Sequence, residues 1–172
     1  MKNVIDIQNN LGDVNNNPSV VLAGGTYNAD PRISAQYGSN LITLAEGYIA
    51  VENNGVWNVA KAAIEVTDAE GNVTYLANTK GFNTSNVTLK LIANVDDYNL
   101  NLNKATGVVL DLNGFTFAKQ INLNNGAELT IKDTSAEKTG KVIVDKETNN
   151  TFAAIVIMRG TLTIDGGTIE TT

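Results

Sequence analysis

The sequence predicts an all-β protein, a parallel β-helix of about three to four coils with β-hairpin capping elements. Short apolar-x-apolar segments recur about every twenty residues, which is the length of one coil made of three short strands. The composition agrees, because the 172 residues include 25 Asn, 19 Thr and 15 Gly. Asn and Gly suit tight turns, whereas Thr suits strands. No segment shows a sustained helical period.

A Gly-Gly-Thr motif occurs near both ends of the chain. Val20–Tyr27 reads VVLAGGTY and Leu162–Ile169 reads LTIDGGTI, so both follow the pattern apolar-x-apolar-x-Gly-Gly-Thr-apolar. The match indicates that one structural element is built twice. The first copy belongs to residues 1–85, an N-terminal strand, Asp-Pro loop and hairpin region. Residues 86–172 are expected to form the coils, in one continuous structural unit with the first region.

Two hairpins are predicted between the motifs. Ala50–Val59 alternates apolar and polar residues around Asn54-Gly55, a dipeptide that favours a two-residue turn. Ile64–Leu76 shows a similar pattern around Glu70-Gly71. We expect both hairpins to cover the amino-proximal end of the β-helix.

Three sets of short strands recur in the second half of the chain. The first set is Leu89-Lys90-Leu91, Leu110-Asp111-Leu112, Leu129-Thr130-Ile131 and Leu162-Thr163-Ile164, at spacings of 21, 19 and 33. The other two sets are Phe115–Phe117 with Val142–Val144, and Leu100–Leu102, Ile121–Leu123 and Ile155–Ile157. We expect two inward columns, Leu89-Leu110-Leu129-Leu162 and Leu91-Leu112-Ile131-Ile164. The longest coil carries its excess in two polar loops, Asp133–Lys141 and Asp145–Thr151.

The alternative fold is an antiparallel sandwich or barrel, whose strands also recur every 8–12 residues or so. The three-strand grouping favours the β-helix, because hairpin pairing does not require leucines and isoleucines to realign after whole coils.

The runs VVLAGGTYNADP and ITLAEGYIAVENNGVWNV resemble repeat proteins of gut-bacterial surfaces and phage particles. The later runs VTLKLIANV, VVLDLNGFTF, AELTIKD and GTLTIDGGTIE are similar to the coils of the same proteins. The resemblance covers residues 18–60 and 86–172. It implies a right-handed parallel β-helix of the pectate-lyase-like type. It also implies an extracellular, cell-surface or virion location, although this chain shows no signal peptide.

Composition excludes several chemistries. The chain has no Cys and no His, which excludes disulfides, thiolate metal sites and a Ser-His-Asp triad. A net charge of −6 disfavours nucleic-acid binding. Pectate-lyase-like enzymes use an Arg base and Asp ligands for calcium. Here only Arg32 and Arg159 are present, neither within a carboxylate cluster, so no catalytic residue is assigned and no cofactor is expected.

Two carboxylates are candidate metal ligands. Asp111 and Asp165 fall near aligned positions of the first strand set and are candidate ligands for a cation between coils. The alternative is that they are outward acidic residues that keep the sheet soluble. A hydrolase pair such as Glu128 and Asp111 has no supporting motif.

Three aromatic residues are candidates for stacking on sugar rings: Trp57, Tyr48 and Tyr27. The alternative for Trp57 is a packing role between hairpin and β-helix. The stretches Asn15–Asn17 and Asn122–Asn125 are either polar ligand surfaces or turns whose amides satisfy backbone groups.

These observations favour a non-catalytic structural or adhesive module that contacts a receptor or glycan. The alternatives are a carbohydrate-binding module and a polysaccharide lyase or glycoside hydrolase. The expected partners are other copies of the chain or a host structural protein, bound through the exposed terminal coil, and glycan. No membrane span is expected.

Overall fold

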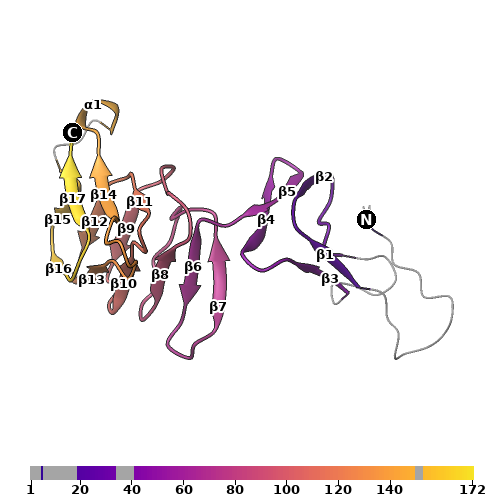
Figure 1. Ribbon diagram of the computed structural model, residues 1–172, viewed down its shortest axis with the longest axis horizontal. Helices are drawn as coiled ribbons and strands as arrows, with labels where there is room; N and C mark the ends of the chain where they lie inside the picture. Colours follow the sequence, from indigo (N-terminus) through magenta and orange to yellow (C-terminus); the bar gives the residue numbers. More distant parts are fainter. Residues whose placement is uncertain (1–4, 6–18, 34–40, 150–152) are drawn as a thin grey trace. The chain divides into compact units, whose positions relative to one another are not determined.

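The computed structural model describes residues 5, 19–33, 41–149 and 153–172. The chain divides into two compact units, Met1–Lys61 and Ala62–Thr172. Within the described residues, all regular structure is β except the four-residue helix α1 (Lys146–Asn149) (Figure 1). The prediction of an all-β protein is therefore confirmed.

The second unit is a parallel β-helix. Its strands are β6 (Ile64–Thr67), β7 (Val73–Leu76), β8 (Thr88–Leu91), β9 (Leu100–Asn103), β10 (Val108–Asp111), β11 (Thr116–Phe117), β12 (Ile121–Asn124), β13 (Ala127–Lys132), β14 (Lys141–Val144), β15 (Ile155–Ile157), β16 (Gly160–Ile164) and β17 (Thr168–Thr171). Parallel pairing runs β8-β10-β13-β16 in the first sheet, β11-β14-β17 in the second and β9-β12-β15 in the third. Successive coils contribute successive strands to each sheet, so the predicted parallel β-helix is confirmed.

The register differs from the sequence prediction at one step. Leu110 lies opposite Leu89, as expected, but its partner in β13 is Ile131 rather than Leu129. The predicted columns Leu89-Leu110-Leu129-Leu162 and Leu91-Leu112-Ile131-Ile164 are thus wrong by two residues between β10 and β13. A shift of two keeps every side chain on the same face of the sheet, so alternation alone does not detect it.

The core of the β-helix consists of the inward side chains of the three sheets. Successive residues of a strand point to opposite faces, so one apolar-x-apolar strand supplies two core residues. The side chains with 0% exposure include Leu89, Leu91, Leu100, Leu102, Leu110, Leu112, Phe117, Ile121, Leu123 and Ile131. The longest coil runs from β13 to β16, and its extra residues lie in the loop between β13 and β14 and around α1, as expected.

The second hairpin caps the amino-proximal edge of the first sheet. Strand β6 pairs antiparallel with both β7 and β8. Ile64 lies opposite Leu91 and is fully buried, so the cap also extends the core. The prediction for this hairpin is confirmed. Because it pairs with β8, it belongs to the second unit, and the division falls after Lys61 rather than at residue 85.

The described residues of the first unit form five short strands. They are β1 (Val20–Leu22), β2 (Gly25–Tyr27), β3 (Ile42–Leu44), β4 (Tyr48–Asn53) and β5 (Val56–Lys61). Strand β1 pairs with β3 in parallel, and the predicted hairpin β4–β5 pairs through β5 with β2. Asn54 and Gly55 form its turn with φ of 53° and 79°, which Asn and Gly tolerate. A small core of Leu22, Ile42 and Val59 lies between these strands.

Candidate functional site

The aromatic candidates lie in the first unit. Trp57 in β5 lies opposite Tyr27 in β2, so the two rings share one face of the sheet. The Arg32 guanidinium lies over the Trp57 ring, 5.1 Å from its centroid. Asp30 fixes this guanidinium, accepting hydrogen bonds from Nε at 2.9 Å and Nη2 at 2.7 Å. These hydrogen bonds from Arg32 hold the pKa of Asp30 below its usual range.

The two tyrosines pack on their own unit. The Tyr27 hydroxyl donates to the Gly24 carbonyl at 2.8 Å, and a Cβ added to Gly25 would lie 2.8 Å from that hydroxyl oxygen. Tyr48 is half-buried against the small core. Sequence reasoning did not foresee that Arg32 would cover Trp57. The three rings therefore contribute to packing in the first unit, which leaves less ring surface for a sugar.

The acidic candidates are not brought together. Asp111, expected to point outward, is only 3% exposed. Its Oδ1 accepts the N–H groups of Asn113 and Thr134, at 3.1 and 3.0 Å, and its Oδ2 accepts the Thr134 hydroxyl at 2.7 Å. Asp165 is exposed and follows β16, which is separated from β10 by β13. Lys132 of β13 lies directly opposite Asp111.

A second buried carboxylate, Asp133, was not predicted as buried. It accepts the N–H groups of Gly114, Ser135 and Gly140 at 2.9, 3.0 and 2.7 Å. Burial raises the pKa of Asp133, but these donors favour its ionised form and hold the pKa below its usual range. Asp111 and Asp133 thus satisfy backbone groups where the coils turn. Among the described residues, no three His, Cys, Asp or Glu side chains are placed to hold a metal.

Amide side chains cover the outer face of the third sheet. Asn122 donates to the Asn101 side chain at 2.8 Å, and Asn125 donates to the Asn103 side chain at 2.8 Å. Asn83 forms two more bonds, with the main-chain N–H and carbonyl of Asn103. Parallel strands in register bring like residues of successive coils side by side, so amides can bond to one another. Of the two stretches singled out in the sequence, Asn122–Asn125 lies on this face, and Asn15–Asn17 lies outside the described residues.

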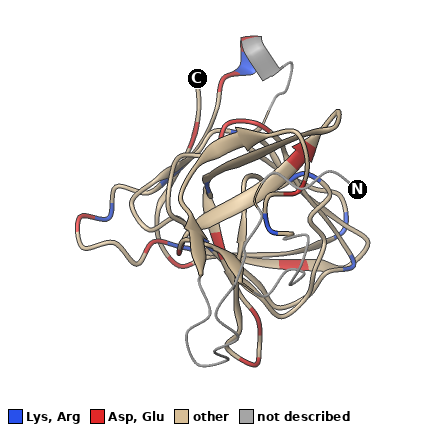
Figure 2. Ribbon diagram, turned by 90° about the vertical axis from the view of Figure 1, so that its right-hand side faces the viewer, with Lys and Arg blue, Asp and Glu red and all other residues tan. Residues whose placement is uncertain are grey.

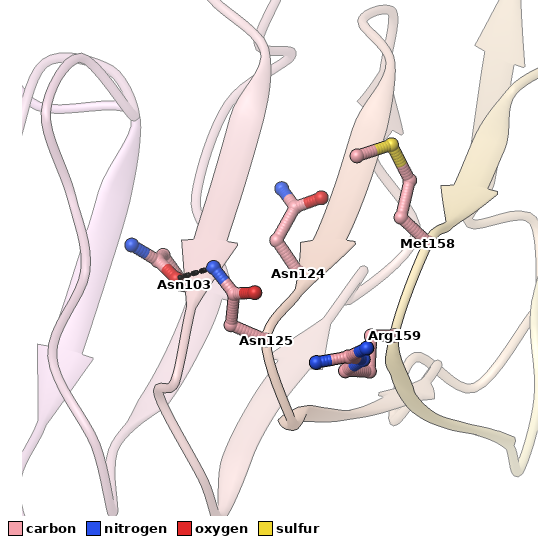
Figure 3. Close-up of a pocket in the computed structure, with 5 residues that line it drawn as sticks. All are labelled: Asn103, Asn124, Asn125, Met158 and Arg159. Atoms are coloured by element: carbon pink, nitrogen blue, oxygen red, sulfur yellow. Dashed lines mark hydrogen bonds between the residues drawn. The ribbon is translucent and has the colours of Figure 1, made fainter.

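An open groove of about 580 Å³ lies at the end of this face (Figure 3). Its lining is Asn103, Asn124, Asn125, Met158 and Arg159. Met158 is 77% exposed and presents an apolar side chain. Within the described part of the chain, neither the Asn124 amide nor the exposed Arg159 guanidinium makes a hydrogen bond or ion pair through its side chain.

The groove offers a specific set of contacts. Amides both donate and accept hydrogen bonds, a guanidinium donates several, and a thioether packs on apolar surface. Among the residues that the structure describes, no carboxylate lines the groove, although the chain is acidic overall. The sequence analysis singled out Asn124 and Asn125, within Asn122–Asn125, but not Asn103 or Met158. Met158 comes beside them only after the long loop that follows β14.

Charges of both signs are scattered along the rest of the described ribbon (Figure 2).

Comparison of the chain with protein-family models, curated proteins and solved structures finds no match. No helix within the described ranges is long and apolar enough to cross a membrane.

Proposed function

We propose that the chain is a non-catalytic adhesive β-solenoid module that binds glycan in the groove of its third sheet. The observation that carries this proposal is the groove itself, which combines unengaged amide and guanidinium groups with one exposed apolar side chain. Sugars present hydroxyls that exchange hydrogen bonds with amides and C–H surfaces that pack on apolar groups. The groove volume lies within the usual range for small-ligand sites, roughly 300–1,000 Å³.

A packed solenoid supports this role. The coils bury one continuous apolar core, so outward side chains stand on a rigid surface. Asn103 and Asn124 end the strands β9 and β12, and the other groove residues directly follow β12 and β15. These three strands are hydrogen-bonded to each other, which holds the groove side chains in a defined array. The sequence resembles surface and phage proteins, so the proposed location of the module is an extracellular cell surface or a virion. Display of a rigid binding face suits both.

The groove supports glycan contact better than Trp57 does. The Trp57 ring already bears the Arg32 guanidinium on its face, whereas Asn124 and Arg159 have no side-chain partner among the described residues. We therefore place the proposed contact on the second unit.

The experiment is a glycan-array screen of the purified chain, followed by calorimetric affinity measurements on each ligand found. Asn124→Ala should weaken binding at least tenfold, because this substitution removes both a hydrogen-bond donor and an acceptor from the groove. Asn101→Ala is the matched control, since it removes an amide from the same face outside the groove. It should change affinity less than twofold. Equal effects of the two substitutions, or no bound glycan, would refute the proposal.

The same ligands also test the catalytic alternative. The chain is expected to release no reducing sugar from them over prolonged incubation. Measurable release that is lost when the protein is heat-inactivated would replace the adhesive proposal with a lyase or hydrolase function.

A further inference from the structure

A row of two cations and one amide runs along one edge of the groove. Strands β9, β12 and β15 pair in parallel, with Asn124 opposite Asn103. The same register, continued past the strand ends, aligns Lys104, Asn125 and Arg159 on successive coils. The Lys104 N–H donates to the Asn124 carbonyl at 3.1 Å, as this register requires. The row therefore places one cation on each side of Asn125.

Both cations of the row are exposed and unengaged. Within the described residues, neither Lys104 nor Arg159 makes a hydrogen bond or ion pair through its side chain. The only other arginine of the sequence, Arg32, is bound to both Asp30 oxygens and lies over the Trp57 ring. In Figure 3 the Arg159 side chain points toward the groove. Its guanidinium is therefore the one that is open to a ligand.

No acidic side chain offsets these charges in the groove. Its described lining contains neither Asp nor Glu. The acidic residue closest to the lining along the chain is Glu128, which lies past the turn in β13 of the first sheet and makes no ion pair with any described residue. The chain as a whole carries a net charge of −6. A positive groove on an acidic protein favours an anionic ligand at that place.

We propose that the groove takes an acidic glycan, one whose sugars carry carboxylates. This inference rests on the proposed function and names the class of sugar. The planar Arg159 guanidinium presents parallel N–H groups that match the two oxygens of one carboxylate. Asn124 exchanges hydrogen bonds with neighbouring hydroxyls, and the exposed Met158 packs on the C–H surface of the ring. Lys104 meets a second carboxylate about 10 Å away, because two coil steps of about 4.8 Å separate the two cations.

The first experiment compares acidic and neutral glycans. An array of uronic acid, sialic acid, sulfated and neutral glycans is screened with the full chain. Each carboxylated glycan that binds is then measured by calorimetry beside its carboxyl-reduced form, in which CH₂OH replaces the carboxylate. We expect the reduced form to bind at least tenfold more weakly, because it cannot form the charged pair with the guanidinium. Added salt should weaken binding of the carboxylated form and leave the reduced form unchanged.

The second experiment locates the preference on one side chain. Arg159→Gln should bring the affinities of the carboxylated and reduced forms within twofold of each other, and Arg159→Lys should restore only part of the preference, because it keeps the charge without the planar fork. Lys104→Gln should weaken binding of the carboxylated form about two- to fivefold, as expected for an exposed charge. Lys90→Gln is the matched control. It removes one positive charge from β8 in the first sheet and should change the preference less than twofold.

The outcomes separate this inference from the proposed function. Equal binding of carboxylated and neutral glycans, or binding of sulfated glycans alone, would overturn the carboxylate and leave the glycan site in place. An equal loss of preference in Lys90→Gln and Arg159→Gln would overturn the role of Arg159. Circular dichroism checks that each variant is folded. Absence of binding to every glycan would overturn both the inference and the proposed function.

Discussion

Asp133 joins successive turns of the β-helix through one buried carboxylate. Its Oδ1 accepts the N–H groups of Gly114 and Ser135, and its Oδ2 accepts that of Gly140. Asp133→Asn keeps the shape of the side chain but replaces one oxygen with an NH₂ group. In either orientation of the amide, at least one backbone N–H then faces a donor instead of an acceptor.

The cost follows from the hydrogen bonds that the substitution removes. A hydrogen bond to a charged group contributes about 1.5–3 kcal/mol, and a buried N–H left without an acceptor costs about 1–3 kcal/mol. We therefore expect Asp133→Asn to lower the free energy of unfolding of the second unit by about 3–5 kcal/mol. Asp111→Asn is the matched control. Its second oxygen meets only the Thr134 hydroxyl, which can rotate to accept from the new amide, so a loss of about 1–2 kcal/mol is expected.

Urea unfolding followed by far-ultraviolet circular dichroism measures both variants, because this signal reports on the β-strands of the second unit, whereas the single Trp, Trp57, lies in the first unit. The pKa of Asp133 is lowered by folding. Its contribution to stability is therefore complete above the unfolded pKa of about 3.9 and is lost as pH falls through the folded-state pKa. The difference in the free energy of unfolding between wild type and Asp133→Asn should stay constant from pH 7 to pH 5 and decrease only below about pH 4. Equal losses in the two variants, or a difference that increases as pH falls, would refute this account.

Two further substitutions test the packing of the coils. Leu112→Asp places a charge at a position with 0% exposure, which costs several kcal/mol of folding free energy. The substitution should therefore abolish the cooperative unfolding transition of the second unit. A melting curve like that of the wild type would contradict the assignment of Leu112 to the core. Gly167→Ala should destabilise by about 1–3 kcal/mol more than Gly126→Ala in the same urea assay. Both glycines have positive φ, but only at Gly167 would the new Cβ meet a neighbour, Leu112 Cδ1 at 2.5 Å, so equal losses would show that the contact relaxes freely.

Much of the fold was predictable because its signals are local. Alternation of apolar and polar residues decides which face of a strand is buried, and Asn54-Gly55 decides where the first hairpin turns. The candidate site was predictable only in part. Asn122–Asn125 was visible as a polar stretch, but Met158 and Arg159 join it from the next coil. Their proximity depends on pairing between β12 and β15.

The sequence by itself determined that short strands stack as parallel coils and which side chain of each strand points inward, because period-2 alternation and coil length are written in the residues. Only the tertiary structure decided the register between β10 and β13, since a shift of two residues preserves every inward position. It also decided that Asp111 and Asp133 are buried. Backbone N–H groups at the turns need acceptors, and these two carboxylates supply them. The N–H groups that donate to them belong to residues up to 23 positions away, so no local pattern reveals the contact.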